Sequence, residues 1–468
     1  MTTWLPDLVF RHTGWADTLV HTYSYFDAQA TLSCDEAGII NNSVSDGNSV
    51  RLSKRALLPG LVNAHSHAFQ RVIRGRTEHR TRNVADSFWT WREMMYSAAT
   101  RLTPEDIYDA SRMAFLEMAL SGITAVGEFH YLHHAPDGKA YDDPNLLAKE
   151  VIRAATDVGL RIALLRVAYA RSGFELEPNP RQVRFVESDP DTYLKNVDQL
   201  RSDCKSLAGI SIGVAPHSVR AVPLDYLQKV SEYAADHSLP AHMHVAEQPA
   251  EVSACIEEYG RSPVALLASE GLLNERFTAV HAIHVTPKAI HSFSDTGAMV
   301  CACPTTERNL GDGVIPADLF FEAGVRLSLG SDSHAQIDLL EDARELEYHL
   351  RLQKLERAVL SNEEDHSTSS LAARLFECAT VNGAKSLSLT TGVLDAGQPA
   401  DFFTVDLDDP SIAGAGEEDL LAAIVFGLSK TAVRDVVVGG KQIVTDGRHA
   451  DQEEIVSRFG QLQKKLWS

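Results

Sequence analysis

The chain has 468 residues, which is enough for one large domain and a smaller one. Hydrophobic residues make up 44% and charged residues 23%, an ordinary balance for a globular protein. The net charge of −21 gives a surface that repels phosphate backbones, so we expect no nucleic-acid partner.

The sequence shows no membrane or secretion signal. No apolar run reaches membrane-spanning length, and the first residues lack the basic and apolar regions of a signal peptide. The six cysteines form no CxxC pair and are too sparse for a disulfide framework. Cys301 and Cys303 could hold a metal, but their apolar run favours packing. We therefore expect a cytoplasmic protein with reduced thiols and no membrane contact.

Both ends of the chain contain short β-prone pieces separated by turns. Near the N-terminus these pieces cover residues 7–10 and 18–25, with turns at 41–43 and 45–48. Near the C-terminus, strands are predicted within 397–406 and 434–441. We expect residues 1–56 and 392–468 to pair into one small β-sandwich domain. A helical pattern over residues 449–468 predicts a terminal helix.

The middle of the chain, residues 57–391, alternates apolar runs with helix-like stretches, including 104–120 and 338–359. The eight apolar runs are 57–64, 123–129, 161–168, 210–216, 240–245, 277–283, 299–304 and 326–330. Continuous apolar strands alternating with helices indicate a parallel sheet covered on both faces. Eight such units predict a (β/α)8 TIM barrel. Residues 169–203 form an insertion that could be a lid, a solvated loop or an oligomer contact.

The first apolar run ends in His65-Ser66-His67. Residues i and i+2 of a strand point to the same face, so His65 and His67 would project together as half of a zinc site. Active sites of such barrels lie at the C-terminal ends of the strands. Polar residues follow seven of the eight runs: Gln70; Glu128, His130 and Tyr131; His217 and Arg220; His242, His244 and Glu247; His281 and His284; residues 305–309; Asp332 and His334.

The spacing within these groups separates ligands from neighbours. His242 and His244 share a face, but His244 lies nearer the strand end and is the better ligand. Glu247 is close enough to act beside a metal as a proton-transfer carboxylate. Asp332 could close a shell of three histidines and one carboxylate, which leaves a position open for water. The metal would lower the pKa of that water toward neutrality and yield hydroxide.

These residues resemble the amidohydrolase superfamily over nearly the whole chain. The resemblance rests on Pro59-Gly60 through His67 and on His244, His281 and Asp332. It implies a metal-dependent (β/α)8 barrel with a small β-sandwich built from both termini. No lysine is evident at residues 213–217, where two-metal members carry a carboxylated lysine. That absence, together with His244-x-x-Glu247, points to the one-metal deaminase branch.

Five finer motifs are similar to those of the formimidoylglutamate deiminases, and the second, third and fifth are the more specific. They cover residues 63–71, 87–93, 127–134, 244–248 and 303–313. The resemblance implies hydrolysis of N-formimidoyl-L-glutamate to N-formyl-L-glutamate and ammonia, a step of histidine degradation, through hydroxide attack on the formimidoyl carbon. It also implies a homodimer with one Zn²⁺ per subunit, although Fe²⁺ and Mn²⁺ can use similar ligands.

The same resemblance assigns a role to each matching residue. The implied metal ligands are His65, His67, His244 and Asp332. The implied catalytic residues are Glu247, His281 and Asp332. The residues implied around the small-molecule dicarboxylate substrate are Gln70, Arg92, Tyr131, His217 and Arg220.

Two arginines suit this substrate, because a guanidinium fork can bind a carboxylate with two hydrogen bonds. Their positions in the sequence also allow other roles. Arg92 could instead pair with Glu93 or stack on a tryptophan, and Arg220 could be solvated. The closest alternative function is another one-metal deaminase, acting on guanine or an adenosine derivative, which would not need two arginines. A non-catalytic scaffold would typically have lost metal ligands.

Overall fold

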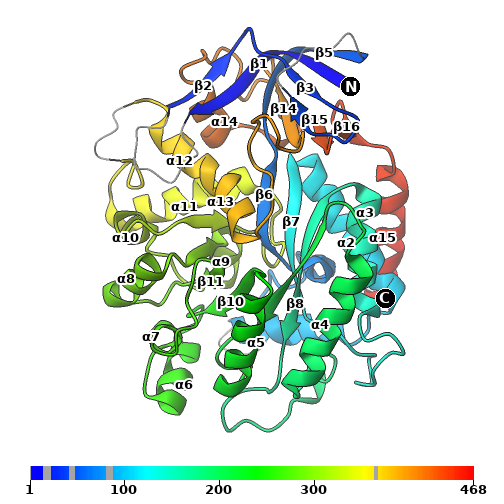
Figure 1. Ribbon diagram of the computed structural model, residues 1–468, viewed down its shortest axis with the longest axis vertical. Helices are drawn as coiled ribbons and strands as arrows, with labels where there is room; N and C mark the ends of the chain where they lie inside the picture. The colour runs from blue at the N-terminus through cyan, green and yellow to red at the C-terminus, as the bar shows by residue number, and fades with distance from the viewer. Residues whose placement is uncertain (1, 14–22, 42–47, 81–87, 363–366) are drawn as a thin grey trace.

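The computed structural model describes residues 2–13, 23–41, 48–80, 88–362 and 367–468. A sheet built from both ends of the chain lies at the top of Figure 1, and a barrel of strands and helices lies below it. Within the described ranges, no helix combines the length and the apolar character needed to cross a membrane. The predicted strand at 18–25 and the turns near 42–47 fall largely outside the described residues.

Eight parallel strands form the barrel sheet and follow one another in chain order. They are β6 (Leu61–Ser66), β7 (Ile123–His130), β8 (Arg161–Ala168), β9 (Ile210–Pro216), β10 (Ala241–Val245), β11 (Phe277–His281), β12 (Met299–Ala302) and β13 (Leu327–Leu329). The first and last strands meet where Asp332 exchanges backbone hydrogen bonds with His65 and His67, at 3.0 and 3.1 Å. The predicted (β/α)8 barrel is therefore confirmed.

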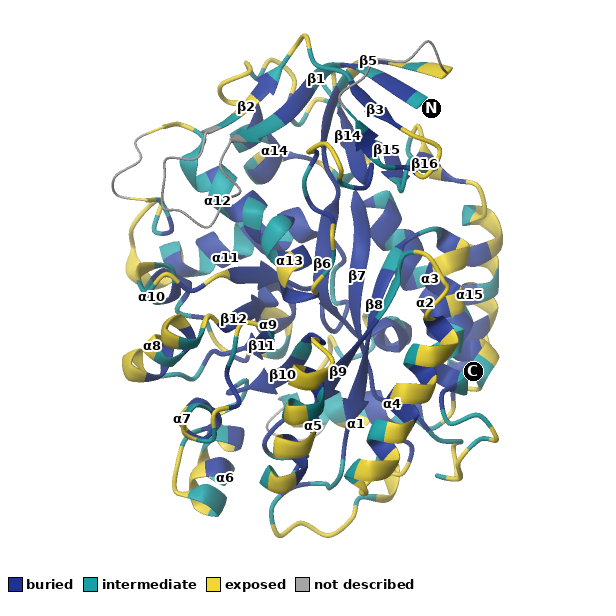
Figure 2. Cartoon of the chain, in the orientation of Figure 1, coloured by how far each residue is buried: buried dark blue, intermediate teal, exposed yellow. Residues whose placement is uncertain are grey.

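Helices cover the outer face of the barrel, and Figure 2 shows buried strands inside helices whose outward sides are exposed. The helical elements of this part of the chain, some of which lie at the barrel mouth, are η1 (Ala68–Ile73), α1 (Phe88–Ala99), α2 (Pro104–Leu120), α3 (Leu146–Val158), η2 (Pro180–Gln182), α4 (Pro190–Cys204), α5 (Leu224–Asp236), α6 (Pro249–Tyr259), α7 (Pro263–Ser269), α8 (Pro287–Thr296), α9 (Pro304–Leu310), α10 (Ala317–Glu322), α11 (Leu339–Lys354), α12 (Ser370–Cys378) and α13 (Val381–Ser386). At the start of α2, Thr103 and Asp106 form a reciprocal capping box. Nearly all of α4 belongs to the segment 169–203, which the sequence singled out as an insertion.

The terminal sheet takes strands from both ends of the chain, as the sequence predicts. Its order is β17-β16-β15-β14-β5-β1-β3-β4, with β2 paired to β1. The strands are β1 (Thr2–Thr13), β2 (Tyr23–Asp27), β3 (Leu32–Cys34), β4 (Ile40–Asn41), β5 (Asn48–Pro59), β14 (Phe402–Asp406), β15 (Val433–Val438), β16 (Lys441–Thr445) and β17 (Arg448–His449). The antiparallel pair of β5 and β14 joins the two ends. Trp4 packs edge-on against Phe402 in the small core of this sheet, with ring centroids 4.9 Å apart.

The apolar run 57–64 is divided between the two sheets. Leu57–Pro59 ends β5 in the terminal sheet, and Leu61 begins β6 in the barrel. Gly60 makes this transition beside Thr124. Only glycine fits here, because a Cβ at residue 60 would lie 2.1 Å from the Thr124 hydroxyl oxygen. The proposed domain boundary between residues 56 and 57 therefore falls inside β5.

The C-terminal segment contains α14 (Leu420–Gly427), η3 (Lys430–Ala432) and α15 (Gln452–Trp467). The predicted terminal helix is α15, which lies against α2 of the barrel. Lys465 pairs with Asp106 at 2.6 Å, and Arg101 donates to the Leu466 carbonyl at 2.9 Å. The end of the chain thus returns from the terminal sheet to the barrel.

One buried carboxylate, that of Asp401, ties the terminal segment to the barrel. It accepts a hydrogen bond from Arg161 at the start of β8 at 2.5 Å. It also accepts from the Thr391 hydroxyl at 2.7 Å and from the Gly439 amide at 2.6 Å. The Asp401 side chain is 1% exposed, so water cannot replace these partners.

Replacing Asp401 by alanine should lower the free energy of unfolding by about 3 kcal/mol, because it strands a guanidinium and two further donors. Urea denaturation followed by circular dichroism measures this loss. Asp408→Ala is the matched control, since Asp408 pairs with Lys54 on the exposed surface, where an ion pair contributes little. Equal stability of the two variants would contradict the structural role of Asp401.

Candidate metal centre and active site

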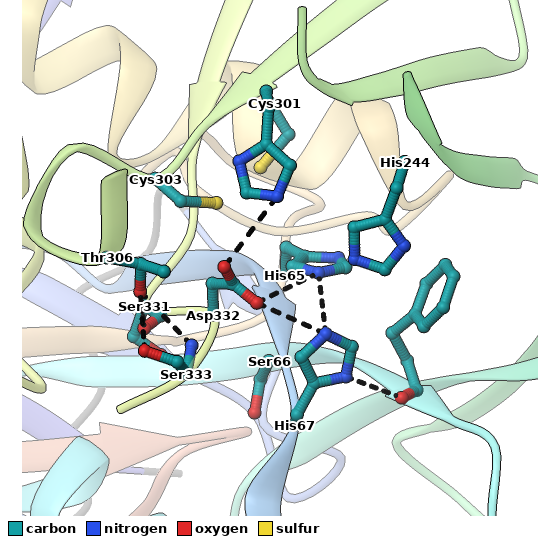
Figure 3. A network of polar contacts seen from close by, with 12 residues as sticks. His65, Ser66, His67, His244, Cys301, Cys303, Thr306, Ser331, Asp332 and Ser333 are labelled. Carbon is teal, nitrogen blue, oxygen red and sulfur yellow. Dashed lines mark hydrogen bonds and ion pairs between the residues drawn. The ribbon is translucent and has the colours of Figure 1, made fainter. Parts of the chain in front are cut away.

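Four buried side chains converge at the mouth of the barrel. His65 and His67 come from the end of β6, His244 from β10, and Asp332 follows β13. Each offers one ligand atom, and these atoms all lie within 4.8 Å of one another. Figure 3 shows the Asp332 carboxylate facing the imidazoles of His65 and His67.

The distances among these atoms suit a single small ion. The Nε2 atoms of His65 and His67 are 3.2 Å apart. Asp332 Oδ1 lies 3.5 Å from His65 Nε2 and 3.1 Å from His67 Nε2. Donor atoms around a tetrahedral ion with bonds of about 2.0 Å lie about 3.3 Å apart, so the three pairs fit one coordination shell.

Hydrogen bonds behind the imidazoles hold the rings in this orientation. His67 Nδ1 donates to the Phe129 carbonyl at 2.9 Å, and His244 Nδ1 donates to the His217 carbonyl at 3.1 Å. Each bond leaves Nε2 free to face the cluster, as is usual for histidine ligands of metals. Ser66 points to the other face of β6 and donates to Glu128 at 2.5 Å.

The protonation states also match those of metal ligands, which bind as neutral imidazoles and ionised carboxylates. Burial lowers the pKa of His65 to about 3, and burial with neighbouring histidines lowers the pKa of His244 well below its usual value. Burial opposes the charge on Asp332, but hydrogen bonds from His65 and His67 outweigh it and hold the pKa of that carboxyl well below its ordinary range. The donor set therefore fits a divalent ion.

A second group, made of His281, Cys303 and Glu307, also brings ligand atoms together. Glu307 Oε1 lies 3.3 Å from His281 Nδ1 and accepts from the Cys303 amide at 2.9 Å. Burial raises the pKa of the Cys303 thiol well above its usual value, which keeps it protonated and a poor ligand. His281 Nε2 points instead toward Asp332 Oδ2 at 3.7 Å and Glu247 Oε1 at 3.8 Å.

Glu247 stands beside the cluster without belonging to it. It follows β10, and its backbone amide donates to Glu251 at 3.1 Å. Glu251 also accepts from the amide of Ala246, which has a left-handed φ of 52°. The buried Glu251 carboxylate therefore holds the strained turn that presents Glu247. Burial raises the pKa of Glu247 above the ordinary value of a carboxyl.

A cavity opens in front of the cluster and collects most of the residues singled out from the sequence. Its lining includes Gln70, Arg92, Tyr131, His217, Arg220, Glu247, His67, His244 and Asp332. Within it, Gln70 donates to the Tyr131 hydroxyl at 2.7 Å. His65 and His281 lie behind these residues and are buried.

The two arginines of the cavity have no carboxylate partner within ion-pair distance among the described residues. Arg92 stacks over Trp89, with the guanidinium carbon 4.2 Å from the ring centroid, and its Nε has no hydrogen-bond partner. Glu93 pairs with Arg181 rather than with Arg92. Arg220 donates to the Ser172 carbonyl at 2.7 Å. Two half-buried cations thus face the cavity. An anionic ligand in the cavity would neutralise their charge.

Several other polar residues at the strand ends have structural contacts away from the cavity. His242 donates to the Ser386 carbonyl at 2.8 Å, and His284 donates to the Asp312 carbonyl at 2.9 Å. Thr305 binds Asp342, and Arg308 pairs with Glu345. Only some of the polar residues predicted at the strand ends therefore line the cavity.

The structure adds residues that sequence patterns did not single out. Tyr96 and Tyr169 line the cavity, and Glu251 borders it. Two signals could have found the tyrosines. Tyr169 directly follows β8, the one strand end to which no polar residue was assigned, and Tyr96 lies four residues after Arg92 on the same face of α1.

Comparisons with known proteins agree with this geometry. The model of the amidohydrolase family matches residues 56–443. A formimidoylglutamate deiminase of Pseudomonas aeruginosa is 40% identical over 413 residues, which cover 88% of this chain and 89% of that protein. An amidohydrolase structure from Brucella melitensis aligns over 100% of both chains, with a TM-score of 0.89 and 32% identity.

An adenosine deaminase from Xanthomonas campestris, solved with bound zinc, shares the fold with a TM-score of 0.81. It is 22% identical, and the alignment covers 99% of this chain and 98% of that one. The matched family model, the similar sequence and the shared barrel give one conclusion: the chain belongs to the amidohydrolase family and is a hydrolase that acts on a carbon–nitrogen bond.

Proposed function

We propose that the protein hydrolyses the linear amidine of N-formimidoyl-L-glutamate to give N-formyl-L-glutamate and ammonia. The observation that carries this proposal is the pair of half-buried arginines, Arg92 and Arg220, in the cavity beside the four-residue cluster. Neither has a carboxylate partner among the described residues, and the substrate brings two carboxylates. The similarity to the Pseudomonas aeruginosa enzyme supports the same reaction. This activity would place the protein in histidine degradation.

The proposed metal ligands are His65, His67, His244 and Asp332, with one ion per subunit. Three imidazoles and a carboxylate suit Zn²⁺ best, and Fe²⁺ or Mn²⁺ can use the same set. When bound, such an ion supplies Lewis acidity and lowers the pKa of water toward neutrality.

The chain's own residues would orient the substrate and move protons. Arg92 and Arg220 would each bind a carboxylate, while Gln70, Tyr131 and His217 border the space between them and the cluster. Glu247 would carry a proton to the departing nitrogen, so that ammonia leaves as a neutral molecule. Glu307 contacts Nδ1 of His281. The Nε2 atom of His281 therefore faces the space between Glu247 and Asp332.

The proposal predicts a clear order of substrates. Metal-loaded protein should release ammonia from N-formimidoyl-L-glutamate far faster than from guanine or adenosine. A coupled ammonia assay on protein of known metal content measures this order. Preferential turnover of guanine or adenosine would show that the chain is a different deaminase of this family.

Replacing Glu247 by glutamine should lower kcat by about 10²- to 10⁴-fold, because the amide cannot carry the proton. Metal content should be unchanged, since Glu247 lies outside the cluster. Steady-state kinetics and elemental analysis of the same sample test both statements. A variant with near-normal turnover would remove Glu247 from the proton path.

The metal site also depends on Gly330, which follows β13. A Cβ at this position would lie 2.7 Å from His65 Cβ and 2.9 Å from the His65 carbonyl oxygen. Gly330→Ala should therefore displace His65 and lower the metal bound per chain after dialysis against limiting zinc. Gly416→Ala is the control, because open space surrounds that glycine. Full metal occupancy in both variants would argue against His65 as a ligand.

The assembly and location of the protein stay predictions. A homodimer in the cytoplasm is what the family resemblance implies. Size-exclusion chromatography with light scattering tests the dimer directly, and a monomeric mass would contradict it.

A further inference from the structure

We propose that the hydroxyls of Tyr96 and Tyr169 are additional hydrogen-bond donors to a carboxylate of the substrate, and that Gln182 orients them. This inference rests on the proposed function and names residues that determine its specificity. Both tyrosines line the cavity that holds Arg92 and Arg220. Gln182 lies behind them and is 2% exposed.

The amide of Gln182 fixes the direction of the hydrogen bonds. Its Nε2 donates to the Tyr96 hydroxyl oxygen at 2.7 Å and to the Tyr169 hydroxyl oxygen at 2.7 Å. An amide nitrogen has two hydrogens, so these two bonds use both. Each phenolic oxygen therefore acts as an acceptor toward Gln182, and its own hydrogen must point elsewhere.

In the cavity, the hydroxyl hydrogens of the two tyrosines can be donated to a bound ligand. Burial raises the pKa of Tyr96 well above its usual value, so its hydroxyl keeps its proton near neutral pH. Among the described residues, no protein acceptor pairs with either hydroxyl on the cavity side. A buried hydroxyl without an acceptor carries a free-energy cost that a bound carboxylate would remove.

The two hydroxyls lie close to the cationic groups of the cavity. The Arg92 guanidinium carbon is 5.5 Å from the Tyr96 ring centroid. The Arg220 guanidinium donates a hydrogen bond to the Tyr169 hydroxyl oxygen, which leaves the hydroxyl hydrogen available. Phe185 packs between the tyrosines, with its centroid 5.8 Å from each ring. Neutral donors placed beside a cation favour a planar anion such as a carboxylate over a neutral base.

The segment 169–189 holds Gln182 in place. Next to it, Arg184 donates to the carbonyls of His134 at 2.8 Å and Leu102 at 2.9 Å. At the end of the segment, the fully buried Arg166 pairs with Glu187 at 2.5 Å. The segment thus forms a fixed wall of the cavity, and Gln182 is a positioning residue on that wall.

The test replaces each tyrosine by phenylalanine, which removes only the hydroxyl. Tyr96→Phe and Tyr169→Phe should each raise KM for N-formimidoyl-L-glutamate roughly 10- to 100-fold, the range for a lost bond to a charged group, while kcat changes little. Tyr226→Phe is the matched control, because its buried hydroxyl donates to the Glu187 carbonyl outside the cavity. KM should not change in this control.

A second readout separates recognition from a general packing effect. Analogues of the substrate that lack either the α-carboxylate or the side-chain carboxylate should be compared in the wild type and in the double variant. The KM penalty of the double variant should disappear with the analogue that lacks the contacted carboxylate and persist with the other. A penalty that is equal for all three compounds would overturn the inference.

The two ways of failing are distinguishable. A wild type that does not act on N-formimidoyl-L-glutamate would overturn the proposed function and this inference with it. An active wild type whose tyrosine variants keep a normal KM would overturn the inference alone. That result would mean that the hydroxyls donate to Gln182 instead of to the substrate.

Discussion

The barrel closes on residues proposed as metal ligands, and the rest of the site depends on this closure. The backbone of Asp332 bonds to His65 and His67 where β13 meets β6, so the same residues complete the sheet and build the cluster. A shift of either strand would break these backbone hydrogen bonds. The same shift would move the side chains of the cluster apart. Gly330 enforces the close approach, because only a residue without a Cβ fits against His65. The closure of the barrel and the geometry of the candidate metal site are therefore coupled.

The site divides its charges between two places. In the cluster, burial keeps the imidazoles of His65 and His244 neutral, and hydrogen bonds keep Asp332 ionised. Across the cavity, Arg92 and Arg220 remain cationic without carboxylate partners among the described residues. One place suits an ion and activated water, and the other suits the carboxylates of a substrate. In a chain with a net charge of −21, such local positive charge would favour an anionic ligand at this site.

Sequence patterns predicted the fold well, because strand and helix periods report burial directly. The alternation of apolar runs indicated the barrel, and the rule that active sites lie at strand ends pointed to His65, His67, His244 and Asp332. The division of one apolar run at Gly60 was not predicted, since the last four residues of β5 and all of β6 are buried and differ only in their partners. The tyrosine pair was also missed. Its role depends on Gln182, which lies 13 residues from Tyr169 and 86 from Tyr96, and sequence spacing carries no signal of such a contact.

The central claim is that one ion binds to three histidines and Asp332 at the barrel mouth. X-ray absorption spectroscopy at the zinc edge, on protein loaded with one equivalent of zinc, tests it most directly. Binding at this cluster predicts only nitrogen and oxygen neighbours at about 2.0–2.2 Å, with the outer-shell scattering of imidazole rings. A sulfur neighbour at about 2.3 Å would place the metal on Cys303 in the second group and contradict the claim.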